Sequence, residues 1–317
     1  MSRIHEALKK AEMERAAGQV LDPPATAPSG TGLQPPLPVR LPSGSTVAID
    51  NHSFAPAVTM PVPGVTLSIE DLMAHAQRTK WHADATVNVF VNPEAAARGA
   101  EQFRTLRSRL LQIRAAQPIS TILITSSVPA EGKTFVTSNL AQAVIRQPDR
   151  RVLMIDADMR CARLHEILGA PQSPGLTDYL SGDSDELSVL QTGAEGNLWM
   201  ISGGKKVPNP SELLSNGRLK VLLERVAPIF DWVLLDAPPC LPVADASVIA
   251  DICDGILFVV KAGSTPASVA QRALRELKGR NILGVVLNAV EEAHSHGSGY
   301  TQGYGYTYGY GSPDAGA

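Results

Sequence analysis

Apolar runs alternate with amphipathic stretches through the middle of this chain of 317 residues. Six short, mainly apolar runs predict strands. They are residues 121–127, 151–158, 197–203, 231–238, 255–262 and 282–290. The stretches 132–147, 209–226 and 265–280 lie between them and predict helices. Because the runs are continuously apolar, both faces of the sheet should be covered, which predicts an α/β fold with a doubly wound, mainly parallel sheet.

The region that precedes these runs predicts three further elements. Residues 68–81 and 93–115 have helical spacing, and Pro93 stands where a proline is favoured, at the start of a helix. Residues 86–91, Thr-Val-Asn-Val-Phe-Val, predict a strand.

Both ends of the chain differ in composition from its middle. Residues 1–18 predict an amphipathic helix on the spacing of Ile4, Ala7, Leu8 and Ala11, which either docks on another surface or frays. Residues 19–64 are rich in proline and predict a disordered linker. Residues 65–290 are expected to form the folded domain, and residues 291–317 a disordered Gly/Tyr-rich tail.

Charge and cysteine usage narrow the class of protein. The net charge is −3 and the isoelectric point about 6.2, so no nucleic-acid partner is expected. The three cysteines have no C-x-x-C spacing, which favours reduced thiols in a cytoplasmic protein. No stretch approaches the ~18 uninterrupted apolar residues of a membrane span, so we do not expect the protein to cross a membrane by itself.

A phosphate-binding loop is predicted directly after the run 121–127. Gly132, Lys133 and Thr134 form the second half of a G-x-x-x-x-G-K-[ST] motif between a predicted strand and a predicted helix. Ser127 stands where the first glycine of the motif is expected. Backbone N–H groups of such a loop face the phosphates, the lysine adds positive charge, and the threonine offers a hydroxyl to Mg²⁺. The predicted nucleotide contacts are Val128, Pro129, Ala130, Glu131, Gly132, Lys133, Thr134 and Phe135.

Carboxylates follow two other predicted strands. Asp156 and Asp158 lie two residues apart and so share one face of a strand, and Asp236 follows four apolar residues in the run 231–238. Beside a phosphate loop, Mg²⁺ is the natural partner of such carboxylates. Two polar residues have open interpretations. Asp245 either belongs to this group of carboxylates or caps a helix. Asn288 either hydrogen-bonds to the edge of an adenine base or caps a loop.

These motifs together resemble those of bacterial tyrosine kinases of the deviant-Walker P-loop type, over roughly residues 86–310. Three more features match that family: Glu101, Arg104 and Arg107 in an E-x-x-R-x-x-R helix, the segment Asn-Pro-Ser-Glu-Leu-Leu at 209–214, and a terminal tyrosine cluster. The first twelve residues are similar to those of the tyrosine autokinases that accompany exosortase-linked exopolysaccharide loci.

The resemblance implies a role for each residue. Lys133 and Thr134 would hold the ATP phosphates and Mg²⁺, and Asp158 and Asp236 would support the metal together with Thr134. Asp156 would orient and deprotonate the incoming tyrosine, and Arg160 would neutralise charge on the transferring group. The implied acceptors are Tyr300, Tyr304, Tyr306, Tyr308 and Tyr310.

The resemblance also implies partners. The tail would be phosphorylated in trans by the next subunit of a ring, and Glu101, Arg104 and Arg107 would dock at that interface, unless they only form i,i+3 ion pairs on a surface helix. A separate membrane protein of the chain-length-determinant type would activate the kinase, and a tyrosine phosphatase would reverse it. The setting would be the cytoplasmic face of the inner membrane, in exopolysaccharide or capsule biosynthesis and export.

Departures from the family pattern keep other functions open. Ala130 replaces a glycine of the usual loop, which strains it if the position needs a positive φ, and Ala162 stands where a proline is common. One alternative is an ATPase switch of the MinD/ParA type, although the signature lysine of that class is absent at Val128. Another is a nucleotide-binding scaffold of a polysaccharide assembly complex. His294 and His296 are too few to predict a metal site.

Overall fold

In this computed structural model the structure describes residues 67–91, 93–193 and 196–290. The predicted N-terminal helix at 1–18, the linker at 19–64 and the tail at 291–317 lie outside the described residues.

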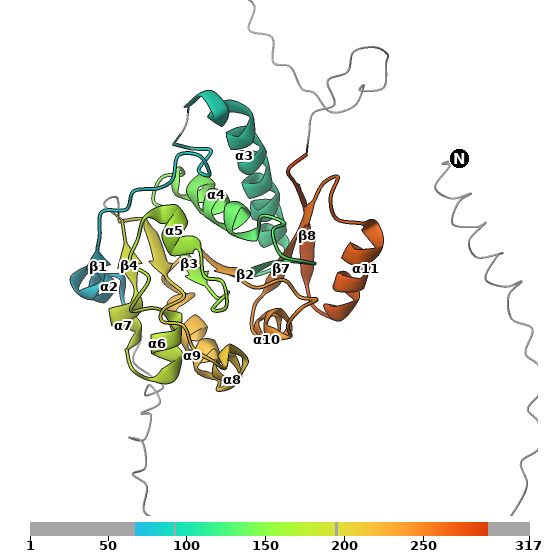
Figure 1. Ribbon diagram of the computed structural model, residues 1–317. Helices are drawn as coiled ribbons and strands as arrows, with labels where there is room; N and C mark the ends of the chain where they lie inside the picture. Colours follow the sequence, from blue (N-terminus) through green and yellow to red (C-terminus); the bar gives the residue numbers. More distant parts are fainter. Residues whose placement is uncertain (1–66, 92, 194–195, 291–317) are drawn as a thin grey trace, which may run out of the picture. The chain divides into compact units, whose positions relative to one another are not determined.

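One sheet runs through the described part of the protein, with the strand order β1-β4-β5-β3-β6-β2-β7-β8 (Figure 1). All neighbouring strands are parallel except β4 and β5, which are antiparallel. The strands are β1 (Gln77–Arg78), β2 (Thr121–Ser126), β3 (Val152–Asp156), β4 (Gln191–Thr192), β5 (Leu198–Ile201), β6 (Trp232–Asp236), β7 (Gly255–Lys261) and β8 (Ile282–Asn288).

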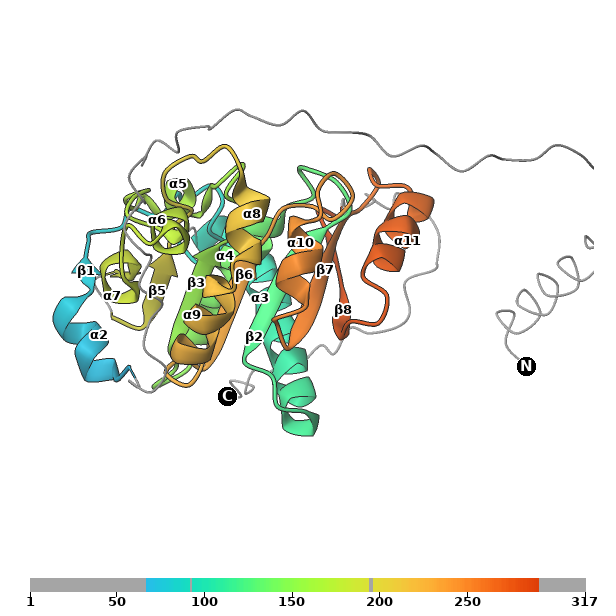
Figure 2. The ribbon, with the colours of Figure 1, turned by 90° about the horizontal axis from the view of Figure 1, so that it is seen from below.

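Helices cover both faces of this sheet (Figures 1 and 2). They are α2 (Ile69–His75), α3 (Pro93–Ala116), α4 (Lys133–Ile145), α5 (Leu164–Leu168), α6 (Leu176–Ser181), α7 (Glu186–Val189), α8 (Pro210–Ser215), α9 (Arg218–Val226), α10 (Asp245–Ala250) and α11 (Ala267–Glu276). Helices α3 and α4 lie on one face, and α8, α9 and α10 lie on the other.

The alternation of side chains along β2 shows how the core is divided. Ile122 and Ile124 are buried in the cluster formed with α3 and α4, whereas Leu123 is buried in the cluster formed with α9 and α10. Successive residues of a strand point to opposite faces, so a strand between two helical layers must be apolar at every position. The continuous apolar runs therefore did predict a sheet covered on both sides, and the doubly wound α/β fold is confirmed.

The strand predicted at 86–91 is wrong, because this segment forms turns. Its backbone groups bond to side chains instead of a neighbouring strand. Asp84 accepts a hydrogen bond of 2.8 Å from the N–H of Thr86, and the Asn139 side chain bonds the C=O of Val87 and the N–H of Val89, each at 2.9 Å.

Two further predictions need correction. The stretch 209–226 forms two helices, α8 and α9, because Gly217 adopts φ +83° between them, which the helix cannot continue through. At the edge strand β8, Val285 and Leu287 are 55% and 59% exposed, so one face of this strand is not covered by the described residues.

Candidate active site

The phosphate loop and the carboxylates meet at one edge of the sheet, at the carboxyl ends of β2, β3 and β6. Asp236 is in register with Ile124 of β2 on one side and with Asp156 of β3 on the other. Ligands of doubly wound sheets bind at this edge, because the strand ends and the helix N-termini both face it. The structure thus brings together Asp156, Asp236 and the loop that precedes α4, as the sequence predicts.

Glu131 braces the phosphate loop from within. Its carboxylate accepts hydrogen bonds from the Val128 N–H at 2.8 Å and from the Thr265 hydroxyl at 2.6 Å, and the residue is 1% exposed. The side chain predicted to contact the nucleotide is therefore engaged in holding the loop against the segment that follows β7. Nothing in the local sequence pattern of Glu131 identifies Thr265 as its partner.

Two residues of the loop have a left-handed backbone. Gly132 has φ +94°, and a Cβ on it would lie 2.0 Å from the Nδ2 atom of Asn288. Ala130 has φ +64°, so the alanine at this position is strained, as expected from its departure from the family loop. The backbone can expose its N–H groups here only because glycine fits at Gly132.

The first turn of α4 places Lys133 and Thr134 beside Asp236. The Lys133 charge and a hydrogen bond from the Thr134 side chain both act on the Asp236 carboxyl, and the Thr137 hydroxyl lies 3.5 Å from Asp236 Oδ1. Burial nevertheless dominates and raises the pKa of Asp236 to about 7. Thr137 was not predicted; its position one turn after Lys133 is the signal that could have found it.

Asp156 has one engaged and one free carboxylate oxygen. Its Oδ2 atom accepts hydrogen bonds of 2.9 Å from the N–H groups of Arg163 and Leu164. Its Oδ1 atom is buried and has no hydrogen-bond partner among the described residues. Burial, with a further contribution from the neighbouring charge of Asp236, raises the pKa of Asp156 well above its usual range. The carboxylate is thus held in one orientation with a single oxygen left for a ligand.

These residues fit a magnesium nucleotide. Two buried carboxylates in register repel each other, and a cation between them or a proton on one of them relieves that repulsion. Carboxylate and hydroxyl oxygens, here from Asp236, Asp158 and Thr134, are the ligand type that Mg²⁺ prefers. No group of three or more His, Cys, Asp or Glu side chains within residues 67–91, 93–193 and 196–290 is arranged to hold a metal ion. Mg²⁺ is usually bound through one or two carboxylates plus substrate phosphates. The absence of a larger cluster among these residues is therefore compatible with a site for magnesium bound to a nucleotide.

Arg160 pairs with a carboxylate from a distant element. Its Nε atom lies 2.9 Å from Asp245 Oδ2, and its Nη2 atom donates a hydrogen bond of 2.8 Å to the Ser211 hydroxyl. Hydrogen bonding to Asp245 raises the pKa of Arg160. Asp245 is the first residue of α10 and makes no capping bond, so its interpretation as a helix cap is wrong. Ser211 was missed, although it lies within the Asn-Pro-Ser-Glu-Leu-Leu segment.

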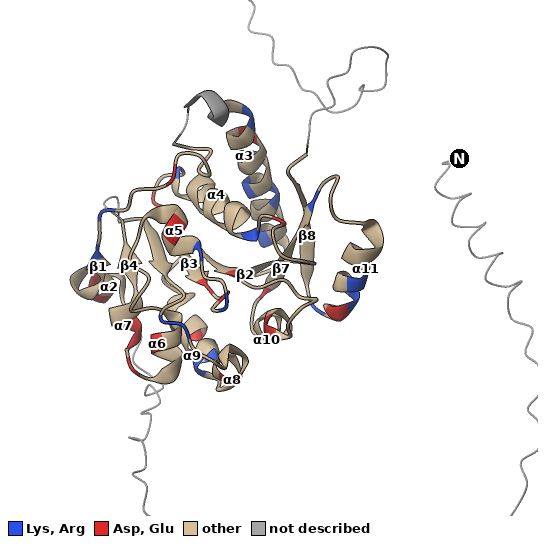
Figure 3. Cartoon of the chain, viewed as in Figure 1, with Lys and Arg blue, Asp and Glu red and all other residues tan. Residues whose placement is uncertain are grey.

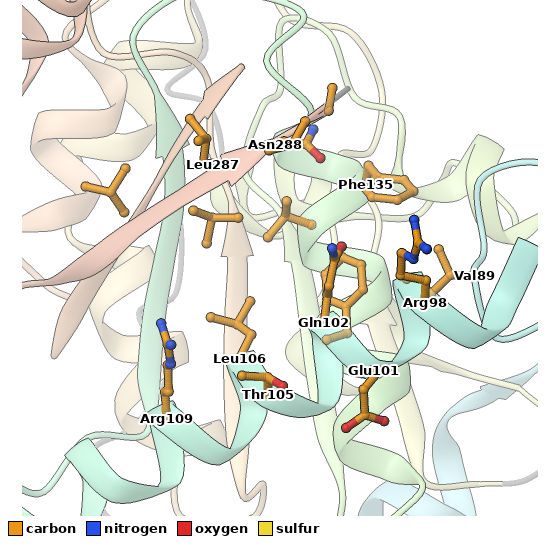
Figure 4. A pocket seen from close by; sticks show the side chains of 17 residues that line it. Val89, Arg98, Glu101, Gln102, Thr105, Leu106, Arg109, Phe135, Leu287 and Asn288 are labelled. Atoms are coloured by element: carbon orange, nitrogen blue, oxygen red, sulfur yellow. The ribbon is translucent and has the colours of Figure 1, made fainter. Parts of the chain in front are cut away.

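Phe135 and Asn288 lie at a cavity of about 630 Å³ between α3, α4 and β8 (Figure 4). Gln102 and Leu106 project from α3 toward β8, whereas Glu101, which also borders the cavity, points away from β8. Phe135 packs edge-on against Phe103, with 5.8 Å between the ring centres. Asn288 donates a hydrogen bond of 2.9 Å to the backbone C=O of Glu131, so it ties β8 to the phosphate loop. Its predicted contact with a nucleotide base stays a prediction.

Helix α3 carries the residues predicted for an oligomer interface, among several basic positions (Figure 3). Arg104 and Glu101 form an exposed i,i+3 ion pair at 3.0 Å. Arg107 differs, because its Nη1 atom donates a hydrogen bond of 2.6 Å to the C=O of Ala143 in α4. Arg107 therefore fastens α3 to the fold, while Glu101 and Arg104 face solvent.

This arrangement is shared with known proteins. Residues 122–302 match the family model of the CobQ/CobB/MinD/ParA nucleotide binding domain. The chain is 33% identical to tyrosine-protein kinase YwqD of Bacillus subtilis over 216 residues, which are 67% of this chain and 90% of that protein. This chain belongs to the family of bacterial tyrosine-protein kinases. It is also 33% identical over 249 residues to tyrosine-protein kinase etk of Escherichia coli, and there the match covers 76% of this chain but about a third (34%) of the length of the relative.

Solved kinase domains of the family share the fold. The kinase domain of the Escherichia coli tyrosine kinase ETK matches with a TM-score of 0.62 and 34% identity, covering 71% of this chain and 88% of that one. The BceF tyrosine kinase domain matches with a TM-score of 0.56 and 28% identity, covering 72% and 93%. Among the described residues of this chain, no helix combines the length and apolarity needed to cross a membrane.

Proposed function

We propose that this kinase transfers the γ-phosphoryl group of ATP to tyrosine hydroxyls, and that its first acceptors are Tyr300, Tyr304, Tyr306, Tyr308 and Tyr310 of a neighbouring copy. The observation that carries the proposal is the Asp156 carboxylate, with Oδ2 fixed by two backbone N–H groups and Oδ1 buried and without a partner among the described residues. Asp156 is in register with Asp236, which lies beside Lys133 and Thr134. A group that must accept a proton from a tyrosine needs this kind of fixed orientation and raised pKa.

The roles of the surrounding residues follow from their positions. Gly132 and the N-terminus of α4 present N–H groups to the phosphates, and Lys133 places positive charge beside them. Asp158, Asp236 and Thr134 would hold Mg²⁺, which supplies neutralisation of the charge on the transferring phosphoryl group. Asp156 Oδ1 accepts the tyrosine proton as the hydroxyl oxygen attacks the γ-phosphorus of ATP, and the bond from that phosphorus to the β,γ-bridging oxygen breaks to release ADP. Phosphoryl transfer needs mostly positioning and charge stabilisation, so this short set suffices.

Transfer between copies is compatible with the length of the tail. Residues 291–310 would span roughly 65 Å if fully extended, which is enough to reach another subunit. We propose that Glu101 and Arg104, exposed on α3, take part in a ring-like homo-oligomer. A separate membrane activator bound through residues 1–64 and a tyrosine phosphatase would complete a system at the cytoplasmic face of the inner membrane, controlling exopolysaccharide or capsule export.

The decisive test uses the purified full-length protein with Mg²⁺ and ATP, followed by intact mass measurement and site mapping. We expect mass gains in steps of about 80 Da, one per added phosphoryl group, on the five tail tyrosines. The Lys133→Met variant should show none. The Asp156→Asn variant should still bind nucleotide but lose transfer, because an amide nitrogen in the place of Oδ1 cannot accept the proton.

The same experiment separates the alternatives. Hydrolysis of ATP with an unmodified tail, both alone and with the proposed membrane activator, would favour an ATPase switch over a tyrosine kinase. Nucleotide binding without hydrolysis or transfer under both conditions would favour a scaffold.

A further inference from the structure

A second cavity lies one strand away from the aspartates. It measures about 280 Å³ and is walled by the segment that follows β3, by α5 and by the segment that follows β5. The ionisable side chains that line it are those of Arg160, Cys161, Arg163, His165, Glu166 and Lys206. None of the roles proposed above uses this cavity, although Arg160 borders it.

The charge of this cavity is positive. Arg160, Arg163 and Lys206 face a single carboxylate, that of Glu166. The guanidinium of Arg160 is already paired with Asp245, whereas Arg163 and Lys206 are exposed and form no ion pair with any residue that the structure describes. Basic residues at this edge are visible in the segment between β3 and α5 and beside α6 (Figure 3). Two cations without a carboxylate partner at one cavity make it suitable for an anion.

The position of the cavity identifies which anion can reach it. The strand order at this edge is β5-β3-β6, so the aspartates lie at β3 and β6 and the cavity at β3 and β5. Neighbouring strands are ~4.8 Å apart, and residues i and i+2 of an extended peptide are ~7 Å apart on one face. A peptide that presents a tyrosine to Asp156 can therefore place a residue two or four positions away over Arg163 and Lys206.

The tyrosines of the tail have the spacing of two and four positions that this geometry requires. Tyr304, Tyr306, Tyr308 and Tyr310 recur at every second residue. A phosphotyrosine carries a charge of about −1.5 to −2 and three strong acceptor oxygens. A guanidinium binds such a group through two parallel hydrogen bonds, and a lysine adds a point charge.

We propose that the cavity lined by Arg163 and Lys206 is a phosphotyrosine subsite, which binds a tail tyrosine that is already phosphorylated while a neighbouring tyrosine is presented to Asp156. The inference rests on the proposed function for its source of phosphotyrosine. Its consequence is an order of events: the first phosphate makes each following transfer to the same tail more favourable. The subsite also offsets the repulsion between a phosphorylated tail and the carboxylates at this edge of the sheet.

Cys161 provides a test that needs no catalysis. It is exposed and lines the cavity, whereas Cys240 is buried, and burial raises the pKa of Cys240 to about 11 and that of Cys253 further. A thiol reagent should therefore react first with Cys161. We would measure the rate of this reaction in the phosphatase-treated full-length protein, with synthetic peptides of residues 300–311 that carry or lack a phosphate on Tyr306.

The phosphorylated peptide should slow alkylation of Cys161 about tenfold more than the unphosphorylated one at equal concentration, because only its phosphate bonds to the two cations. The double variant Arg163→Ala/Lys206→Ala should remove the difference. Lys220→Ala, which removes an exposed lysine on α9, should leave it intact. Equal protection by both peptides in the unaltered protein would overturn the proposal. Protection by inorganic phosphate at the same concentration would also overturn it, since the cavity would then be a general anion site.

A kinase assay with the same peptides gives the second readout. The phosphorylated peptide should have a KM about tenfold lower than the unphosphorylated one, with similar kcat, and the double variant should raise only the KM of the phosphorylated peptide. If the protein transfers no phosphate but the phosphopeptide still protects Cys161, the proposed function fails and the subsite stands. If transfer proceeds with equal KM values and equal protection, the subsite fails and the kinase function stands.

Discussion

The side-chain amide of Asn288, at the end of β8, donates a hydrogen bond of 2.9 Å to the backbone C=O of Glu131 in the phosphate loop, 157 residues earlier. The same amide occupies the space that a Cβ on Gly132 would need. The loop is therefore held from two sides, by Asn288 outside it and by the carboxylate of Glu131 within it.

Replacing Asn288 should weaken nucleotide binding. In Asn288→Ala the loop loses a hydrogen bond worth about 1 kcal/mol, so we expect the Kd for ATP and for GTP to rise about fivefold each in a titration with either nucleotide. The matched control is Asn281→Ala. Asn281 also donates to a backbone C=O, that of Asp254 at 2.7 Å, but at the opposite end of β8.

The comparison of the two nucleotides distinguishes the two roles of Asn288. Equal losses would identify a residue that holds the loop. A loss confined to ATP would show that the amide reads the adenine base instead, and no loss at all would mean that the bond to Glu131 does not stabilise the loop.

Ala130→Gly should stabilise the protein. The left-handed conformation of Ala130, with φ +64°, costs an alanine roughly 1–2 kcal/mol that a glycine does not bear. Greater freedom of glycine in the unfolded state offsets about 0.5–1 kcal/mol of this gain. We expect the free energy of unfolding in urea to rise by up to about 1.5 kcal/mol. Ala115→Gly, the same change at an exposed position of α3, should lower it by about 0.5–1 kcal/mol. A loss of stability in both variants would argue against the strained loop.

Much of the fold can be predicted from the sequence because its signals are local. A strand buried on both faces is a continuous apolar run, and the phosphate loop has a spacing that its chemistry dictates. The strand predicted at 86–91 failed because its backbone bonds to Asn139, a residue some fifty positions later. Strand β4 is two polar residues, Gln191 and Thr192, which carry no strand signal and pair because β1 and β5 lie on either side of them.

The residues of the candidate site also fall into two groups, those that a local sequence pattern identifies and those that only the folded structure brings together. Gly132, Lys133 and the aspartates stand at strand ends, where their residue types already suggest their chemistry. The partners Arg160 and Asp245 are separated by 85 positions, so only the folded protein reveals that they are paired. Side chains that bond across such distances depend on packing, which no local pattern reports.

Two arginine variants of helix α3 should separate an effect on stability from an effect on self-association. Arg107→Ala removes the hydrogen bond to Ala143 O from a half-buried side chain, and we expect the free energy of unfolding to fall by about 1–3 kcal/mol. Arg104→Ala removes only an exposed ion pair and should change stability by less than about 0.5 kcal/mol. In sedimentation experiments with the full-length protein, Arg104→Ala should weaken self-association. Unchanged association in Arg104→Ala and in Glu101→Ala would remove this face of α3 from the proposed interface.

The pair of Arg160 and Asp245 should control transfer rather than nucleotide binding. Asp245 has 3% of its side chain exposed, and it accepts a hydrogen bond of 2.5 Å from Ser211, so the guanidinium of Arg160 is fixed beside Asp158 from the side of α8 and α10. In Asp245→Asn the shape is kept but the charge that holds Arg160 is lost. We expect the rate of tail phosphorylation to fall about tenfold, equivalent to about 1.4 kcal/mol in the barrier, while the Kd for ATP stays the same.

Asp231→Asn is the matched control. Asp231 pairs with Arg150 at 2.5 Å and lies just before β6, at the opposite end of that strand from Asp236. Its replacement should therefore leave phosphorylation unchanged. Equal rates in Asp245→Asn and the unaltered protein would show that Arg160 does not need this partner to act on the transferring group.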